Sequence, residues 1–406
     1  MRVIFVAPFF METTLRFVNA TADLPGVQLG LLSQDPFDKL PVALQKKLSA
    51  HWRVDHALGT EHLLHGVDGL RRKLGGCDRL LGPLEHIQVQ VAQVRDHFGI
   101  PGMSAETIKN FRDKARMKDR FRAAGIPCAR HTLVQSVADA WDFVRLVGYP
   151  IVLKPKEGSA SQGTARVQND AEMAHNLGWM RPSVENPVVA EEFITGLERS
   201  FETISIRGVP VWDSHTRYDP APLSVLENPW IQWTVLLPRE VETTDTQAIR
   251  KDARAALTAL GMGTGLSHME WFRRPNGSIA ISEVAARPPG AQIVTLNSYA
   301  HDVDFYRLWS NLMVYEQFTP PARKYAAGAA FFRGQGRGNV IAVHGLDQAQ
   351  REIGHLVVEA RLPKPGMPQG ATYEGEGYAI VRHPDTSVVE HALQRLISLV
   401  RVELGG

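Results

Sequence analysis

The stretch LSHMEWFRRPNGSIAISEVAARPPG, residues 266–290, consists of two apolar-rich runs on either side of Asn276-Gly277. Asn-Gly is the dipeptide that most favours a two-residue hairpin turn, because both central residues must adopt positive φ. Counting outward from that turn places Glu270 directly opposite Glu283. Two facing carboxylates repel each other and destabilise the strand pair unless a positive charge lies between them. The alternative interpretation is that both glutamates lie on a solvated face.

The two faces of the predicted hairpin differ in character, because successive side chains point to opposite faces of a strand. The carboxylate face also carries His268, Phe272, Ile281 and Ala285. The other face carries the mainly apolar set Met269, Trp271, Ser282 and Val284. We therefore expect the carboxylate face to carry chemistry and the other face to pack against the core.

An arginine follows the second strand, directly before the turn Pro288-Pro289-Gly290. The planar guanidinium of Arg287 can donate two parallel hydrogen bonds to a phosphate. Mg²⁺ is usually held by one or two carboxylates together with substrate phosphates. The two glutamates and Arg287 together therefore indicate a magnesium–nucleotide site.

Length and composition limit the class of protein. At 406 residues the chain exceeds the usual size of one core, so two or three domains are expected. A formal net charge of +2 gives no basic field of the kind that nucleic acid requires. The two cysteines, Cys77 and Cys128, lack neighbours at metal-binding spacing, which favours a reducing compartment. Residues 3–10 are apolar but too short for a membrane span, so we expect a cytoplasmic protein.

The first hundred residues alternate short apolar runs with helical patterns, which is typical of βαβ units around a parallel sheet. Strands are predicted at residues 3–6, 27–32, 53–56 and 79–81, with a longer helix at about 85–98. No Gly-x-Gly-x-x-Gly turn follows the first strand, so a dinucleotide site is not indicated there. Gly99-Ile100-Pro101-Gly102 marks the first domain boundary.

Two lysines precede the hairpin in patterns of interest. Lys114 lies in FRDKARMKDRFRAAGIP, residues 111–127, which predicts a helix whose basic residues would ordinarily form a solvated face. Lys154 is the fourth residue of the strand IVLKP, which stands directly before KEGSASQGT. A loop of small residues after a strand can form a nest of backbone N–H groups for an anion, although many such loops are surface turns. The spacing does not match a P-loop.

The region between this loop and the hairpin contains strands and one strong helix. Residues 187–194, PVVAEEFI, predict a strand, and Glu198 follows in a half-exposed alternating pattern. The aromatic and polar mixture at 211–238 fits either a small-molecule pocket or an edge-strand surface. The helix expected at about 243–260 should cover the apolar face of the hairpin.

The features form an ordered set along the chain. In order they are Lys114, Lys154 with its glycine-rich loop, EEFI, Glu198, Glu270, Glu283 and Arg287. This order resembles the ATP-grasp superfamily over roughly residues 100–320. The strings SHMEWF and EVAARPPG and the C-terminal segment look most like its L-amino acid ligase branch.

The resemblance implies an α/β and α+β multidomain fold. Residues 1–100 would form a Rossmann-like βαβ pre-ATP-grasp domain, and residues 101–324 an ATP-grasp domain of two α+β subdomains. The lid subdomain would span about 128–195, and residues 325–406 would form a small C-terminal α+β unit of the ligase type.

The resemblance also implies roles for individual residues. ATP would be bound by Lys114, Lys154, Gly158, Ser159, Ser161, Gly163, Glu191, Glu192, Phe193, Ile194 and Glu198. Glu270 and Glu283 match the ligands of Mg²⁺, with Mn²⁺ as an alternative ion, and Arg287 matches the arginine that stabilises the transferred phosphoryl group. His268 matches a histidine near the reacting carboxylate, and a structural histidine is its alternative. Many members carry Asn at the position of Ala285, so the resemblance leaves the number of metal ions open.

The activity implied is ATP-dependent joining of a carboxylate to an amine through an acyl phosphate, releasing ADP and phosphate. Amino acids or small carboxylates would be the substrates, with no nucleic-acid or membrane partner and a homodimer as the candidate assembly. The alternatives are a biotin-carboxylase-like or purine-pathway ATP-grasp enzyme, and a nucleotide-binding module without catalysis.

Overall fold

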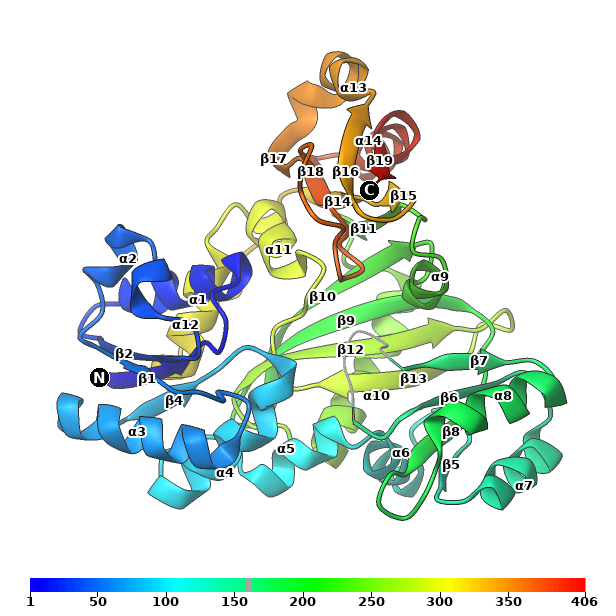
Figure 1. Cartoon of the computed structure of the whole chain (residues 1–406), viewed down its shortest axis with the longest axis horizontal. Coiled ribbons are helices and arrows are strands. Elements are labelled where there is room, and N and C mark those ends of the chain that lie inside the picture. The colour runs from blue at the N-terminus through cyan, green and yellow to red at the C-terminus, as the bar shows by residue number, and fades with distance from the viewer. Residues whose placement is uncertain (158–162, 406) are drawn as a thin grey trace.

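The computed structural model describes residues 1–157 and 163–405. The expected mixed α/β and α+β multidomain class is confirmed. Figure 1 shows the N-terminal unit at the left, the large central sheet in the middle, the lid at the lower right and the C-terminal elements at the top. Within the described part of the chain, no helix is both long enough and apolar enough to cross a membrane.

The N-terminal unit is built on a parallel sheet in the order β3-β2-β1-β4. Its strands are β1 (Arg2–Val6), β2 (Gln28–Ser33), β3 (Ala50–Arg53) and β4 (Arg79–Leu81). The third strand lies three residues before the expected position, because its half-exposed edge sequence has a weak apolar signal. Parallel sheets are covered on both faces. Here α1 (Glu12–Ala22) covers one face, and α3 (Thr60–Leu74) and α4 (Gln88–Phe98) cover the other.

A contact between the helices α1 and α12 joins the N-terminal unit to the rest of the molecule. The ring of Phe17 in α1 lies 4.7 Å from the rings of both Tyr306 and Trp309 in α12 (Phe305–Tyr315). These edge-on aromatic contacts are buried and each adds to the area-based stabilisation. The N-terminal unit is therefore packed against the body through a shared core.

The basic helix expected at residues 111–127 is shorter than predicted. The structure has α5 (Ala105–Arg112) and α6 (Lys114–Ala123) instead of one helix beginning at Phe111. Asp113 ends the first helix with extended backbone and caps the second, its side chain accepting from the N–H of Arg116 at 3.1 Å. A side-chain oxygen at an N-cap satisfies a backbone donor that the helix leaves unpaired.

The large sheet has the strand order β13-β12-β9-β10-β11-β14-β18-β17 in the described residues. Its strands are β9 (Leu197–Ile206), β10 (Val209–Asp219), β11 (Trp233–Leu237), β12 (Gly265–Arg273), β13 (Ile279–Ala285), β14 (Ala326–Phe332), β17 (Val357–Arg361) and β18 (Gly377–His383). Pairing of β11 with β14 carries the sheet across the boundary expected at residue 324. The domain boundaries at 100 and 324 stay predictions.

Helix α10 (Thr244–Leu260) covers the apolar face of the hairpin, as the sequence predicts. Ile249, Ala253, Leu257 and Leu260 form its buried stripe. They pack against Met269, Trp271 and Val284 of the hairpin. The helix ends at Gly261, whose φ of +79° is the left-handed conformation that glycine adopts without a Cβ penalty.

The lid is a separate antiparallel sheet in the order β5-β8-β6-β7. Its strands are β5 (His131–Val134), β6 (Ile151–Pro155), β7 (Ala165–Val167) and β8 (Val188–Glu192). Two helices, α7 (Val137–Val147) and α8 (Asp170–Met180), pack on its outer face. Figure 1 shows this sheet beside the β12–β13 edge of the large sheet. The backbone N–H of Ile281 donates to the carbonyl of Pro127 at 2.8 Å and ties the two together.

The C-terminal elements combine the end of the large sheet with a smaller sheet. Strands β15 (Gly334–Gln335), β19 (Arg401–Gly405) and β16 (Asn339–His344) form that smaller sheet. The helices α13 (Leu346–Ile353) and α14 (Thr386–Leu399) share a hydrophobic core with both. Helix α14 ends at Leu399, and the chain then continues into the strand β19.

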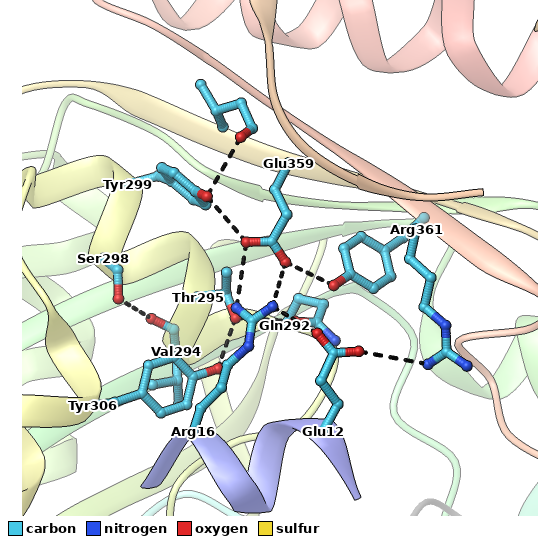
Figure 2. Close-up of polar contacts among 12 residues, drawn as sticks. Glu12, Arg16, Gln292, Val294, Thr295, Ser298, Tyr299, Tyr306, Glu359 and Arg361 are labelled. Carbon is cyan, nitrogen blue, oxygen red and sulfur yellow. Dashed lines mark hydrogen bonds and ion pairs between the residues drawn. The ribbon is translucent and has the colours of Figure 1, made fainter. Parts of the chain in front are cut away.

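A carboxylate joins the N-terminal unit to the C-terminal elements. Figure 2 shows Arg16 of α1 and Tyr299 of α11 (Ile293–His301) converging on Glu359 of β17. Arg16 lies 2.7 Å from Glu359, and the hydroxyls of Tyr299 and Tyr378 donate to the same carboxylate at 3.0 and 2.8 Å. Burial raises the pKa of Glu359, but Arg16 and the hydroxyls outweigh it and lower the pKa below its ordinary value. The carboxylate therefore stays charged while it joins three parts of the fold.

A partly buried arginine, Arg323, keeps the neighbouring buried histidine His301 neutral. The Nδ1 of His301 donates to the carbonyl of Asn297 at 2.8 Å, and its Nε2 accepts from Arg323 at 3.3 Å. Burial and the adjacent guanidinium lower the pKa of His301 to about 3. Protonation would place two cations side by side in the core, so acid should favour the unfolded chain.

We predict that His301→Gln flattens the pH dependence of stability. The folded pKa is depressed, so its contribution is complete above about pH 6.5 and is lost as pH falls toward 3. The unfolding free energy of the wild type, measured with urea, should fall relative to the variant by about 1.4 kcal/mol per pH unit below pH 6.5. The exposed His391→Gln is the control and should follow the wild type. Parallel curves for the wild type and His301→Gln would contradict the prediction.

Candidate active site

The hairpin places Glu270 of β12 opposite Glu283 of β13, but its loop differs from the expected one. The turn has three residues, Pro275 to Gly277, since the N–H of Arg274 donates to the carbonyl of Ser278 at 2.9 Å. Gly277 has a φ of +81°, whereas Asn276 does not adopt positive φ. Pro275 suits the first position of this turn, because proline has the φ that the position requires. The predicted two-residue turn is therefore wrong.

A β-bulge restores the pairing of the two glutamates. The register shifts between Glu270 and Trp271, because Trp271 pairs with Ile281 and Ser282 is the extra residue. The bulge turns Ile281 into the apolar core, so its expected place on the carboxylate face is wrong. Ser282 faces the other way from the prediction and lines the cavity.

A cavity of about 530 Å³ lies between the lid and the large sheet. Its charged lining residues come from the N-terminal unit, α6, the lid, the large sheet and the segments next to that sheet. They are Glu85, Lys114, Lys154, Arg166, Glu191, Glu192, Glu198, Glu227, His268, Glu270, Glu283 and Arg287. The volume falls in the range of small-molecule sites. The structure therefore gathers the described candidates Lys114, Lys154, Glu198 and Arg287 in one cavity with both hairpin glutamates.

Two lysines share one carboxylate at the edge of the cavity. The Nζ of Lys154 lies 2.8 Å from Glu191 Oε1, and the Nζ of Lys118 lies 3.3 Å from Glu191 Oε2. Burial would raise the pKa of Glu191, but the two ammonium groups lower it below its ordinary value. Two cations and one carboxylate leave net positive charge there, which suits an anionic ligand.

Lys118 is a residue that sequence reasoning missed. It is fully buried in α6 and also donates to the carbonyl of Ser282 in the hairpin at 2.9 Å. It therefore links α6, the lid strand β8 and the bulge of β13. Its position in the sequence could have indicated a role at the site, because residues four apart lie on one face of a helix and the predicted site residue Lys114 is four residues earlier.

Lys114 and Arg287, two further cations of the cavity, each pair with an acid. Lys114 Nζ lies 3.1 Å from Glu283 Oε1. Arg287 forms an ion pair with Glu85, which follows β4 in the N-terminal unit and also pairs with Arg112 of α5. Burial raises the pKa of Glu85, but Arg287 and Arg112 lower it overall. Glu85 was not a predicted site residue, because nothing in its local sequence distinguishes it.

His268 lies between two carboxylates. Its Nδ1 is 2.9 Å from Glu202 Oε1, and its Nε2 is 3.7 Å from Glu270 Oε1. Burial lowers the pKa of His268, but the contacts with Glu202 and Glu270 outweigh it and raise the pKa to about 9. The imidazole is therefore charged at neutral pH and is oriented by the fully buried Glu202.

The other end of the cavity is formed by the residues after β8 and by β12. Ile194 packs with Phe272 of the hairpin, and the guanidinium of Arg166 stacks 4.3 Å from the Phe193 ring. Glu192 is paired with Arg130 at 2.6 Å. Burial and the nearby Glu270 raise the pKa of Glu198 to about 8.

Part of the predicted glycine-rich loop lies outside the described residues. Gly158, Ser159 and Ser161 are in the undescribed segment 158–162. Gly163 is described and has a φ of +71°, and a Cβ there would lie 2.9 Å from the Pro155 ring. Glycine is therefore required at 163, both for its backbone conformation and for the close approach.

The two hairpin carboxylates, Glu270 and Glu283, fit Mg²⁺ only together with oxygens from a bound nucleotide and from water. Among the described residues, no group of three or more His, Cys, Asp or Glu side chains is placed to hold a metal ion. Two facing carboxylates suffice for Mg²⁺ when phosphates and waters supply the remaining oxygens. Lys114 and Lys154 lower the pKa of Glu283 despite its burial, so its carboxylate is ionised and available. Ala285 lines the same cavity and offers no ligand atom.

Residues 119–302 match the family model of the ATP-grasp domain. The chain contains an ATP-grasp domain. A match to the uncharacterized protein y4rH of Sinorhizobium fredii is 26% identical over 331 residues, 78% of this chain and 66% of that protein. A match to the L-arginine-specific L-amino acid ligase of Bacillus subtilis is 24% identical, over 60% of this chain and 59% of the ligase.

The ATP-grasp fold is also shared by solved structures over the whole chain. The L-amino acid ligase from Bacillus licheniformis superposes with a TM-score of 0.79 at 18% identity, covering 100% of this chain and 99% of that one. The phosphoribosylglycinamide synthetase from Anaerococcus prevotii gives 0.71 at 14% identity, with the same coverage. The matched stretches span about two thirds or less of the curated relatives y4rH and the arginine-specific ligase.

We predict that Lys118→Met destabilises the fold by about 3 kcal/mol, because removing one partner leaves buried polar groups uncompensated. The matched control is Lys109→Met, whose ammonium group is largely exposed and lies 3.7 Å from Glu106. That control should cost less than about 1 kcal/mol. Urea denaturation of the two variants measures both effects, and equal losses would contradict a structural role for Lys118.

Proposed function

We propose that the chain is an ATP-dependent carboxylate–amine ligase that forms an amide or peptide bond through an acyl phosphate. One observation carries the proposal: Glu270 and Glu283 face each other in a cavity that also holds Lys114, Lys154 and Arg287. The similarity to L-amino acid ligases supports amino acids or small carboxylates as substrates.

The proposed reaction has two steps. An oxygen of the substrate carboxylate attacks the γ-phosphorus of ATP, and the bond to the ADP oxygen breaks. The amine nitrogen then attacks the acyl carbon, a carbon–nitrogen bond forms, and inorganic phosphate leaves. Such transfers require mainly positioning and charge stabilisation from the protein. No protein nucleophile is required.

The cations of the cavity would have different roles in this reaction. Lys114 and Lys154 would bind the phosphates of ATP, and Arg287 would stabilise the transferred phosphoryl group. The contact with Glu85 fixes the guanidinium of Arg287 before a substrate arrives. Glu270 and Glu283 would hold Mg²⁺, with Mn²⁺ as the alternative, and the chemistry supplied there is neutralisation of phosphate charge.

The remaining predicted residues receive roles on the same basis. Charged His268 would lie near the reacting carboxylate, where a positive charge favours a bound anion. The nucleotide would occupy the end of the cavity near Phe272, contacted by the lining residues Glu191, Glu192, Phe193, Ile194 and Glu198. Gly163 would contact it from the glycine-rich loop. The homodimer and the cytoplasmic location expected from the sequence stay predictions.

A purine-pathway activity is the second candidate. It is supported by a 26% identical match to the formate-dependent phosphoribosylglycinamide formyltransferase of Synechococcus, over 68% of this chain. A ribonucleotide substrate would need cations for its own phosphate. Among the described lining residues, the side of the cavity formed by 218–233 and 373 contributes no Lys or Arg, which favours a substrate without phosphate.

We predict that Glu283→Gln and Arg287→Ala each lower ADP release about 1,000-fold while the fold is retained. ADP release is measured with MgATP and pairwise mixtures of amino acids, and mass spectrometry identifies the product. The exposed Glu242→Gln and Arg401→Ala are the matched controls and should keep wild-type rates.

Two outcomes would overturn the ligase proposal. Retention of most turnover in either Glu283→Gln or Arg287→Ala would remove the assigned chemistry. A rise in melting temperature with ATP, without ADP release for any carboxylate and amine, would instead favour a nucleotide-binding module that lacks catalysis.

A further inference from the structure

One side of the cavity is an aromatic wall, which we define as Tyr218, Trp233 and Tyr373. Trp233 of β11 lies at the centre, with Tyr218 at 6.1 Å and Tyr373 at 5.6 Å between ring centroids. Phe331 stacks behind Trp233 at 5.0 Å and 23°. Offset and edge-on aromatic pairs of this kind are stabilising and hold each ring in one orientation.

The polar group of the central ring is already satisfied within the protein. The indole Nε1 of Trp233 donates to the backbone carbonyl of Tyr373 at 2.8 Å, and the Trp233 side chain is only 2% exposed. Trp233 therefore offers no free hydrogen-bond donor to a ligand, and the accessible surface of the aromatic wall comes mainly from the half-buried rings of Tyr218 and Tyr373. This surface suits an apolar group better than a charged one.

A short, mainly apolar helix lines the same cavity as the aromatic wall. Pro222, Leu223 and Leu226 of α9 (Pro222–Glu227) line the cavity, while Val225 of the same helix is buried in the core. The polar lining residues of α9 are Ser224 and Glu227. The helix and the aromatic wall thus present mainly carbon to the cavity.

The aromatic wall begins beside the arginine that the ligase proposal uses. Gly290 ends the Arg287-Pro288-Pro289-Gly290 turn, and a Cβ at 290 would lie 2.3 Å from the Tyr373 hydroxyl oxygen. Such a distance is a clash, so the close approach requires glycine at 290. The hydroxyl of Tyr373 therefore lies against Gly290, which is three residues after Arg287 in the sequence. Tyr373 and Arg287 both line the cavity.

We propose that the carboxylate substrate carries a bulky apolar side chain, preferably aromatic, which packs between the aromatic wall and α9. This inference rests on the ligase function proposed above. The side chain would lie against Trp233 and Leu226 while the carboxylate lies toward Arg287. Burying a larger apolar side chain in a matching pocket gives about 10- to 100-fold discrimination over a small one.

The test varies only the acid and keeps the amine constant. Hydroxylamine serves as the amine, since its nitrogen attacks the acyl phosphate and gives a hydroxamate with release of phosphate. Phenylalanine, leucine, alanine, glutamate and arginine are compared as acids by hydroxamate formation and ADP release with MgATP. We expect kcat/KM for phenylalanine and leucine to exceed that for alanine at least tenfold, and glutamate and arginine to be poor substrates.

A filling variant locates the selectivity. Leu226→Phe should lower the ratio of kcat/KM for phenylalanine to kcat/KM for alanine about tenfold or more, because the larger ring takes up room in the part of the cavity that α9 lines. Leu223→Phe is a second filling variant, and melting temperatures check that each one folds. Leu58→Phe, at a partly exposed position in the N-terminal unit, is the control and should behave as the wild type.

The outcomes separate this inference from the function on which it rests. Preference for alanine, glutamate or arginine would overturn the inference and leave the ligase proposal standing. Preference for phenylalanine that neither filling variant changes would also overturn it, since the selectivity would lie elsewhere. ADP release with none of the acids, alone or paired with amines, would overturn the ligase proposal itself.

Discussion

The carboxylates of Glu270 and Glu283, which face each other across one strand pair, determine the charge balance of the whole cavity. Like charges at this spacing are tolerated in a partly buried site only when cations are held nearby. Lys114 reaches Glu283 from α6, and Lys154 approaches from the lid. Elements far apart in the sequence are thus held around the hairpin by electrostatics as well as by packing. An anionic, metal-bound ligand would complete the same balance.

The sequence predicts the pairing of these glutamates through an argument that is only partly correct. The loop has three residues because Pro275 presets its first position, and this alone would shift the register by one residue. The bulge at Ser282 adds one residue to the second strand and restores the pair. The two deviations cancel for Glu270 and Glu283 but not for Ile281, which faces the core. Local pattern predicts the two strands and the position of the turn, but not the length of the loop, and a bulge leaves little trace in the sequence.

The rest of the site depends on contacts between distant parts of the chain. Lys118 could have been noticed from its spacing to Lys114, yet its burial depends on Glu191, more than seventy residues later. Glu85 meets Arg287 across two hundred residues, and no local motif marks it. The approach of Tyr373 to Gly290 likewise arises from the folding of the last segment onto the centre. Periodicity and turn chemistry describe neighbours in sequence, so they do not reveal such partners.

The continuity of the large sheet has a consequence for how such a protein can change. Because β14 pairs directly with β11, the C-terminal elements are not a detachable module. Replacing them with those of another protein would require a new strand to match an existing hydrogen-bonding edge, residue by residue. Diversification of this scaffold is therefore easier at α9 and at the loop carrying Tyr373, which line the cavity without forming the sheet. New chemistry at the substrate end would arise by small local substitutions, and exchange of whole domains would be the harder route.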